Sequence, residues 1–161
     1  MNSSMEKCAV VAALRASIND ELMSVESTAA MARDEATNSE TKAEGKYDTR
    51  ATEASYLARG QAWRIAELRK LSAWLNTDQA TAELTRPVVQ NGALVRLEGP
   101  RSEWVYIAPV GGGKAMVCNQ TVRLISLASP LGTAMEGLEA GDCFEVSTPR
   151  GLHEYELLHL T

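Results

Sequence analysis

The apolar positions in the first 75 residues follow the repeat of an amphipathic helix. Consecutive apolar residues are three or four positions apart from Val11 to Ala32, and the same spacing returns from Ala54 to Leu75. This spacing keeps one apolar stripe on one side of a helix. Residues 37–45 interrupt the pattern with Thr, Asn, Ser, Glu and Gly. The two segments therefore predict an antiparallel hairpin of two helices, each roughly 45 Å long if about 30 residues are helical.

The two stripes also predict how the helices pack. The first stripe thins to alanine towards its end, which would let the partner helix come close. Gln61 is the polar member of the second stripe and suits a residue that fixes the register. Asp48 or Thr49 could cap the second helix, and residues 76–80 mark its end. The stripe positions are Val11, Leu14, Ile18, Leu22, Val25, Ala29 and Ala32, and then Ala54, Leu57, Gln61, Ile65, Leu68, either Leu71 or Ser72, and Leu75.

After Pro87 the pattern changes to the alternation of β-strands. Glycine, proline and asparagine separate the alternating segments and predict turns. One short helix is expected over 129–137, with Ser129 as its N-cap and Pro130 in its first turn. The sequence thus predicts an α+β protein with a coiled-coil hairpin over 1–80, an acidic tip near 34–48, and a small antiparallel β domain over 81–161. The six expected strands are residues 93–98, 103–108, 114–118, 122–126, 143–147 and 153–158.

Composition and charge narrow the classes of function. The chain has 161 residues, 45% of them hydrophobic, and a formal net charge of −5. Acidic residues outnumber basic ones on both sides of residue 80, so no binding to free DNA is expected. Cys8, Cys118 and Cys143 have no metal-ligand spacing and are expected to be small buried residues in a reducing cytoplasm. Neither a signal peptide nor a membrane span is expected.

The other residues that could form a catalytic or ligand-binding site are interpreted as structural. The Gly111–Gly113 run before Lys114 lacks the spacing of a phosphate-binding loop and predicts a hairpin turn. His153 and His159 have no nucleophile partner in a recognisable arrangement. The tryptophans are expected to pack, with Trp63 and Trp74 on the hairpin or the second domain and Trp104 in the sheet.

Residues 129–146 resemble the C-terminal signature of the bacterial Gre transcript-cleavage factors. The shared pattern is Ser-Pro, a short helix that ends before Gly, then Gly-Asp and a strand. Residues 154–158 are similar to the family's last strand, and residues 64–68 to its second coiled-coil helix. The resemblance covers most of the chain and implies a helical hairpin followed by an FKBP-like domain. Prolyl isomerase activity is not expected, because the domain has few aromatic residues for such a pocket.

The resemblance implies bacterial RNA polymerase as the partner. In that family the globular domain docks at the secondary channel, and the hairpin carries two acids to the polymerase Mg²⁺. A second Mg²⁺ held by carboxylates then helps a water cleave backtracked RNA. By this resemblance the chain is not an enzyme, has no cofactor of its own, shares Mg²⁺ with the polymerase, and contacts nascent RNA only indirectly. The implied docking residues are Ser129, Pro130, Leu131, Gly141 and Asp142.

The tip departs from the family pattern. The family tip reads Asp-x-x-Glu-Asn-Ala, whereas Glu40, Glu44 and Asp48 here are four residues apart and would share one face of a helix. Either alignment register leaves one matched acid, Glu44, which is the candidate Mg²⁺ ligand. The chain therefore resembles a divergent paralogue. Contacts with channel acids or RNA phosphate are assigned to the neighbouring tip residues Lys42, Lys46, Tyr47 and Arg50.

Three functional hypotheses follow. The first is a polymerase-binding factor that modulates elongation or transcript cleavage. The second is an inhibitor that blocks the channel without cleavage activity. The third is a protein-interaction module that shares only the fold, since fold alone does not fix function.

Overall fold

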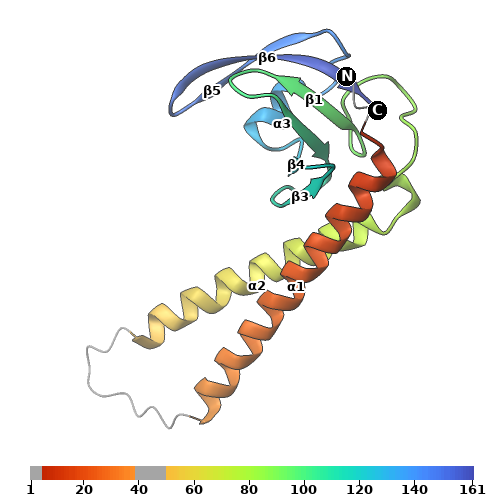
Figure 1. The fold of residues 1–161 in the computed structure, drawn as a ribbon. Coiled ribbons are helices and arrows are strands. Elements are labelled where there is room, and N and C mark those ends of the chain that lie inside the picture. The colour runs from red at the N-terminus through yellow and green to blue at the C-terminus, as the bar shows by residue number, and fades with distance from the viewer. Residues whose placement is uncertain (1–4, 39–49) are drawn as a thin grey trace.

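The fold was analysed in a computed structural model of the chain. The structure describes residues 5–38 and 50–161, and the side chains of residues 5–35 and 52–161. Figure 1 shows a pair of long helices that projects from one side of a curved sheet. Within these described ranges no helix is both long and apolar enough to cross a membrane.

The predicted helical hairpin is present as α1 (Lys7–Asn38) and α2 (Arg50–Leu75). Where the helices approach the sheet, the predicted stripe is buried, as Leu14 and Leu71 illustrate. Polar contacts join the two helices in addition to this apolar packing. Arg15 donates two hydrogen bonds to the carbonyl oxygen of Leu75, at 3.1 and 2.6 Å, and so satisfies an orphan carbonyl at the end of α2.

A bidentate ion pair joins the helices further along. Arg64 on α2 donates from Nε and Nη2 to one carboxylate oxygen of Glu21 on α1, at 3.0 and 2.6 Å. Both side chains remain about one-third exposed, so the pair contributes little stability and mainly fixes the register.

The predicted close packing of the distal seam is wrong. Ala32 and Ala54 are exposed, and 69% of Leu57 is accessible to solvent. Figure 1 shows α1 and α2 diverging towards their distal ends, so these residues face no partner helix. Alanine side chains bury too little apolar area to hold two helices together there.

The six predicted strands form one sheet, and most of their bounds match the alternation to within two residues. The sheet order is β3-β4-β2-β1-β6-β5. A short helix α3 (Pro130–Met135) and a 3₁₀ turn (Asp78–Ala80) complete the fold. The strands are β1 (Leu94–Glu98), β2 (Glu103–Ile107), β3 (Lys114–Val117), β4 (Gln120–Ile125), β5 (Cys143–Thr148) and β6 (Gly151–Leu160).

The sheet is mixed, which corrects the antiparallel prediction. β4 folds back on β3 and then pairs with β2 in parallel, with Trp104 opposite Val122 and Ile107 opposite Ile125. Alternation along a strand identifies its faces but not its neighbours, so the sequence pattern could not reveal this pairing.

Apolar residues cover both faces of the sheet. One core joins the proximal halves of α1 and α2 to Leu94, Tyr106 and Leu124. The other lies under α3 and contains Val105 and Met135. The helical hairpin and the sheet therefore share a core, and a buried hydrogen bond from the Tyr106 hydroxyl to the Ala80 carbonyl, at 2.8 Å, reinforces it.

The glycine run 111–113 connects β2 to β3, but these strands are not neighbours in the sheet, so the predicted hairpin turn is wrong. The run lies directly against α1. A Cβ atom on Gly113 would stand 2.8 Å from Cδ1 of Ile18, and the residue has a φ of +145°. Beside it, the Ser17 hydroxyl donates to the Lys114 carbonyl at 2.8 Å. Glycine is needed here because a side chain would push the turn away from the helix.

Several single-residue expectations need correction. Cys8, Cys118 and Cys143 are all exposed, not buried. Trp63 has 70% of its surface exposed and does not pack as expected. Trp104 is buried in the sheet, as predicted, and Trp74 is partly buried against the same core. Cysteine and tryptophan are apolar enough for a core but also occur on surfaces, so residue type alone did not decide their positions.

Candidate functional site

The segment that carries the sequence signature begins with a capped helix. The Ser129 hydroxyl accepts a hydrogen bond from the amide N–H of Gly132 at 3.1 Å and donates to the Ser126 carbonyl at 2.7 Å. Pro130 occupies the first turn of α3, where its missing N–H costs nothing. The predicted N-cap and short helix are both confirmed.

Close packing explains the glycine inside α3. A Cβ atom on Gly132 would lie 2.0 Å from the carbonyl oxygen of Ser126 and 2.8 Å from Cα of Leu127. Thr133 adds a hydrogen bond from its hydroxyl to the Leu127 carbonyl at 2.9 Å. The helix is therefore held against the end of β4 by contacts between backbone and backbone.

The Gly-Asp part of the signature shapes a turn before β5. Gly141 has a φ of +97°, and its N–H donates to the Leu157 carbonyl at 2.7 Å. One carboxylate oxygen of Asp142 accepts from the Glu139 N–H at 2.8 Å. Ser129, Gly141 and Asp142 thus use their polar groups or backbone freedom inside the domain.

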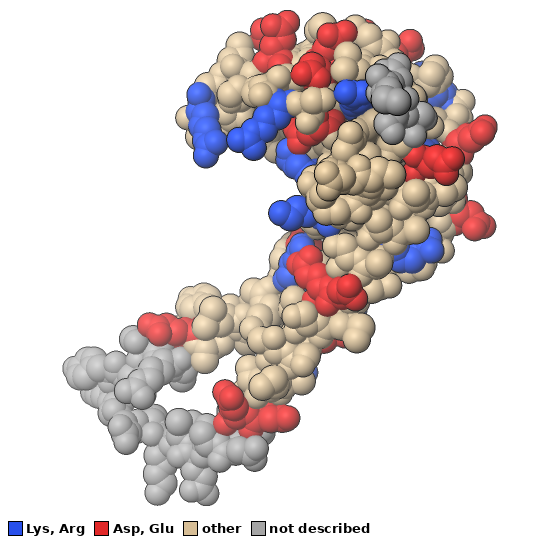
Figure 2. All heavy atoms as spheres, in the orientation of Figure 1, with Lys and Arg blue, Asp and Glu red and all other residues tan. Residues whose placement is uncertain are grey.

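The five predicted docking residues do not all line one hollow. A hollow of about 610 Å³ lies beside α3, and Ser129, Pro130 and Leu131 line it, whereas Gly141 and Asp142 do not. Pro130 is exposed and Leu131 is half-buried against the α3 core. Figure 2 shows the concave face between the sheet and the hairpin, with Lys and Arg side chains along its edge.

Sequence reasoning missed the other walls of this hollow. Glu67 of α2, Arg123 of β4 and the glycine run 111–113 line it together with α3. A weak contact of 3.8 Å joins Glu67 to Arg64. These segments are far apart along the chain, so no spacing in the sequence connects them.

Two buried ionisable groups lie where the hairpin meets the sheet. Lys7 donates from Nζ to the Ala82 carbonyl at 2.9 Å. Burial lowers the pKa of Lys7, and attraction to Cys8 and Glu83 opposes that shift. Burial also raises the pKa of Tyr106 to about 12. Both shifts arise from desolvation in a packed junction and do not create a proton-transfer pair.

The residues assigned to the tip lie outside the described part of the chain. These are Glu40, Lys42, Glu44, Lys46, Tyr47 and Asp48, together with the side chain of Arg50, whose backbone begins α2. Within residues 5–38 and 50–161, no group of three or more His, Cys, Asp or Glu side chains could hold a metal ion. The tip assignments therefore remain predictions.

Comparison with known families and curated proteins identifies the C-terminal half. Residues 86–161 match the family "Transcription elongation factor, GreA/GreB, C-term". The transcription elongation factor GreA of Orientia tsutsugamushi (strain Boryong) is 55% identical over 38 residues, which are 24% of each chain. GreA of Rickettsia prowazekii (strain Madrid E) is 34% identical over 97 residues, which are 59% of this chain and 57% of that one.

Two solved structures also align with the chain. Gfh1 of Thermus aquaticus aligns with a TM-score of 0.37 and 20% identity, covering 89% of this chain and 90% of Gfh1. The elongation factor GreA/GreB of Nitrosomonas europaea aligns with a TM-score of 0.34 and 19% identity, covering 69% and 93%.

The family match covers the C-terminal part of the chain. The chain spans between a quarter and three-fifths of the length of the curated relatives it matches. Its residues 86–161 are a GreA/GreB C-terminal domain. The signature from Ser129 onwards predicted this match, and the chain has the predicted α+β fold.

Proposed function

We propose that this chain is a transcription factor that binds bacterial RNA polymerase and inserts the tip of its helical hairpin into the secondary channel. The observation that carries the proposal is the GreA/GreB C-terminal domain over 86–161, joined to a pair of long helices that projects from it. The partner implies a cytoplasmic location. The chain acts on the polymerase and is not itself an enzyme.

The architecture supports this proposal, because it combines a globular domain that could dock on the polymerase with a long helical hairpin that could reach into it. The 32 residues of α1 correspond to a helix of about 48 Å at the usual rise per residue. The hollow beside α3 opens on the concave side between sheet and hairpin, where a protruding element of a partner would touch both parts. The C-terminal domain would then hold the polymerase while the hairpin reaches inward.

In this proposal the tip acts through carboxylates. Glu44, helped by Glu40 or Asp48, would contribute oxygen ligands to a second Mg²⁺ at the polymerase active site. Lys42, Lys46, Tyr47 and Arg50 would contact channel acids or RNA phosphate. Because Glu44 is the one acid that matches the family tip, stimulation of transcript cleavage is expected to be weak.

The same departure at the tip favours a second candidate function. With one matched acid, Glu44, the hairpin could fill the secondary channel without completing a two-metal site. The protein would then inhibit nucleotide addition and support no cleavage. The two candidates share the partner and the binding mode, and they differ only in what the tip does.

Binding is tested by gel filtration of the full chain with core RNA polymerase. We expect co-elution at micromolar concentration. Pro130→Arg places a bulky side chain at the rim of the hollow beside α3 and is expected to weaken binding about tenfold or more, as for an interface position that loses its fit. Pro149→Arg is the matched control, because Pro149 is also exposed but lies in the β5–β6 turn and does not line the hollow. Absence of co-elution by the wild type contradicts the proposal.

The role of the tip is tested by transcript cleavage on backtracked complexes. We expect the wild type to cleave more weakly than an ordinary Gre factor, and Glu44→Ala to abolish the remaining cleavage while polymerase binding stays nearly intact. Glu53→Ala, an exposed acid in the first turn of α2, is the control and should behave as wild type. Robust cleavage that Glu44→Ala leaves unchanged would show that the tip assignment is wrong. Inhibition of nucleotide addition without cleavage would favour the inhibitor.

A further inference from the structure

One edge of the sheet is open to a further strand. The sheet order places β3 and β5 at its two edges. The β3 edge is partly covered, because β3 lies against α1 and Ser17 bonds to the Lys114 carbonyl. β5 pairs with β6, and within residues 5–38 and 50–161 no other strand pairs with it. Figure 1 shows the β5–β6 pair on the side of the sheet away from the helical hairpin.

The register shows which backbone groups of β5 point outward. Where the pairing with β6 starts, the Leu157 N–H donates to the Asp142 carbonyl at 2.9 Å. Bonded pairs recur at every second residue of an antiparallel pair, so Phe144 and Val146 bond to β6. The N–H and C=O groups of the residues between them point away from the sheet. These outward residues are Cys143, Glu145 and Ser147, and their side chains are exposed.

Four glutamates share one face of the sheet at this edge. Glu145 on β5 is directly opposite Glu154 on β6, and Glu98 on β1 is directly opposite Glu156. Side chains two residues apart on a strand lie on the same face, so Glu154 and Glu156 join the two pairs. All four side chains are exposed. We call this surface the glutamate face.

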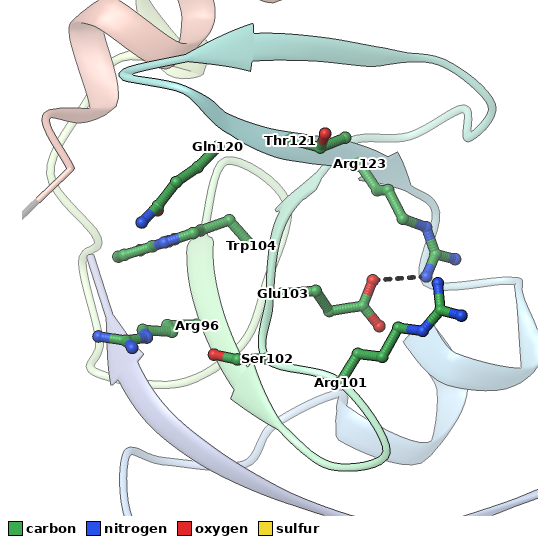
Figure 3. Close-up of a pocket in the computed structure, with 8 residues that line it drawn as sticks. All are labelled: Arg96, Arg101, Ser102, Glu103, Trp104, Gln120, Thr121 and Arg123. Atoms are coloured by element: carbon green, nitrogen blue, oxygen red, sulfur yellow. Dashed lines mark hydrogen bonds and ion pairs between the residues drawn. The ribbon is translucent and has the colours of Figure 1, made fainter.

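The rest of the face does not neutralise these charges. Arg96 lies two positions before Glu98 on the same strand and therefore on the same face. Figure 3 shows Arg96 on the same side as Trp104 and away from Arg123. One arginine offsets at most one of the four carboxylates. Since like charges on opposed residues of neighbouring strands repel, a cation that approaches this face is attracted.

The other face of β5 is apolar. Val146 is buried, and Phe144 is half-buried and stacked on Tyr155, with ring centroids 5.6 Å apart. Phe144 also packs against the core under α3. A strand added at this edge would therefore have carboxylates beside one of its faces and apolar side chains beside the other.

We propose that the outer edge of β5 binds an extended segment of a partner protein in which basic and apolar residues alternate. The segment adds a strand by bonding to the outward backbone groups of Glu145 and Ser147. Its residues paired with these two carry their side chains on the glutamate face, which fits lysine or arginine. Its intervening residues lie beside Phe144 and Val146, which fits valine or isoleucine. This contact does not depend on binding to the polymerase.

Charge argues against two other occupants of this edge. A second copy of the chain fits poorly, because antiparallel pairing of two β5 strands brings both Glu145 carboxylates onto one face. A nucleic acid is repelled by the glutamate face and by the net charge of −5. The occupant must instead bring cations along one face of a strand.

The charge requirement is tested with the full chain and a short fluorescein-labelled peptide in which lysine and valine alternate. We expect saturable binding by anisotropy, and none of a matched peptide with glutamate in place of lysine. Glu145→Lys should weaken binding about fivefold, because an attraction becomes a repulsion. This variant should keep its fold, since the new lysine faces Glu154. Glu53→Lys makes the same charge change on an exposed site of α2 and should bind as wild type.

The backbone requirement is tested by amide hydrogen exchange, followed by NMR. In the free protein the amides of Glu145 and Ser147 should exchange faster than those of Phe144 and Val146, and the lysine–valine peptide should slow the first two selectively. Ser147→Pro removes an outward N–H and leaves the bonds to β6 in place, as is usual for proline on an edge strand. It should weaken peptide binding about tenfold or more.

Three results would overturn the proposal. The first is no saturable binding of the lysine–valine peptide at millimolar concentration. The second is binding that leaves exchange at Glu145 and Ser147 unchanged, or equal binding of the glutamate peptide. The third is exchange at these two amides that slows with increasing protein concentration in the absence of peptide, which would show that two copies of the chain pair through β5.

Discussion

Replacing Gly132 with alanine adds one methyl group where α3 touches the end of β4. The new Cβ atom would stand 2.0 Å from the Ser126 carbonyl oxygen and 2.8 Å from Cα of Leu127. Both neighbours are backbone atoms, so no side-chain rotation can relieve the overlap. The helix must move outward by on the order of 1 Å or more to restore van der Waals separation.

That movement has a calculable cost. Overpacking of this kind typically costs about 1–3 kcal/mol, and the contact is with backbone, which favours the upper end. The shift also weakens two hydrogen bonds, from Ser129 to Ser126 and from Thr133 to Leu127, worth about 1 kcal/mol each. Alanine recovers about 1 kcal/mol of helix propensity. Gly132→Ala should therefore lower the free energy of unfolding by about 3 kcal/mol, and the melting temperature by roughly 6–12 °C for a chain of this size.

Thermal unfolding followed by tryptophan fluorescence and circular dichroism measures this effect. Gly60→Ala is the matched control, because Gly60 lies exposed in α2 and a Cβ atom there meets nothing within 4 Å. That variant should be stabilised by up to about 1 kcal/mol, from helix propensity alone. The same substitution thus has opposite signs at the two sites. A Gly132→Ala protein as stable as wild type would refute the reasoning about α3.

Further predictions concern the shared core, the end of α2 and the cysteines. Tyr106→Phe should lose about 1–2 kcal/mol in urea unfolding, because the buried Ala80 carbonyl loses its donor. Since burial raises the pKa of Tyr106 from 10.0 to about 12, this stabilisation is complete below pH 10 and falls between about pH 10 and 12, a decline that Tyr106→Phe should lack. Arg15→Met should cost about 1–2 kcal/mol through the lost bonds to Leu75, whereas Arg59→Met, on an exposed part of α2, should cost much less. All three cysteines should react rapidly with a thiol reagent in the native protein, and protection of any of them would contradict their exposure.

Most of the local structure could be predicted from the sequence, because interactions between residues close together in the chain determine it. Alternation placed the six strands, and Ser129 with Pro130 marked the start of α3, since capping depends only on neighbouring residues. The parallel pairing of β2 with β4 was not predictable, because strand neighbours depend on the path of the chain. The exposure of Leu57 and Trp63 was missed because the stripe assumed a partner helix along its whole length.

The candidate site was also predictable only in part. The signature residues were recognisable, yet Gly132, Gly141 and Asp142 turn out to hold the domain together, while the hollow beside α3 also needs Glu67 and Arg123 from distant segments. Such sites arise from tertiary packing, which no spacing along the chain encodes.

Competition for core RNA polymerase tests the central claim most directly. A fluorescently labelled Gre factor is first bound to the polymerase, and the unlabelled full chain is then added while anisotropy is measured. If the chain occupies the secondary channel, it should displace the labelled factor completely along a single-site curve, and Pro130→Arg should shift that curve to higher concentration whereas Pro149→Arg should not. A labelled factor that stays bound at saturating concentrations of the chain would contradict the account.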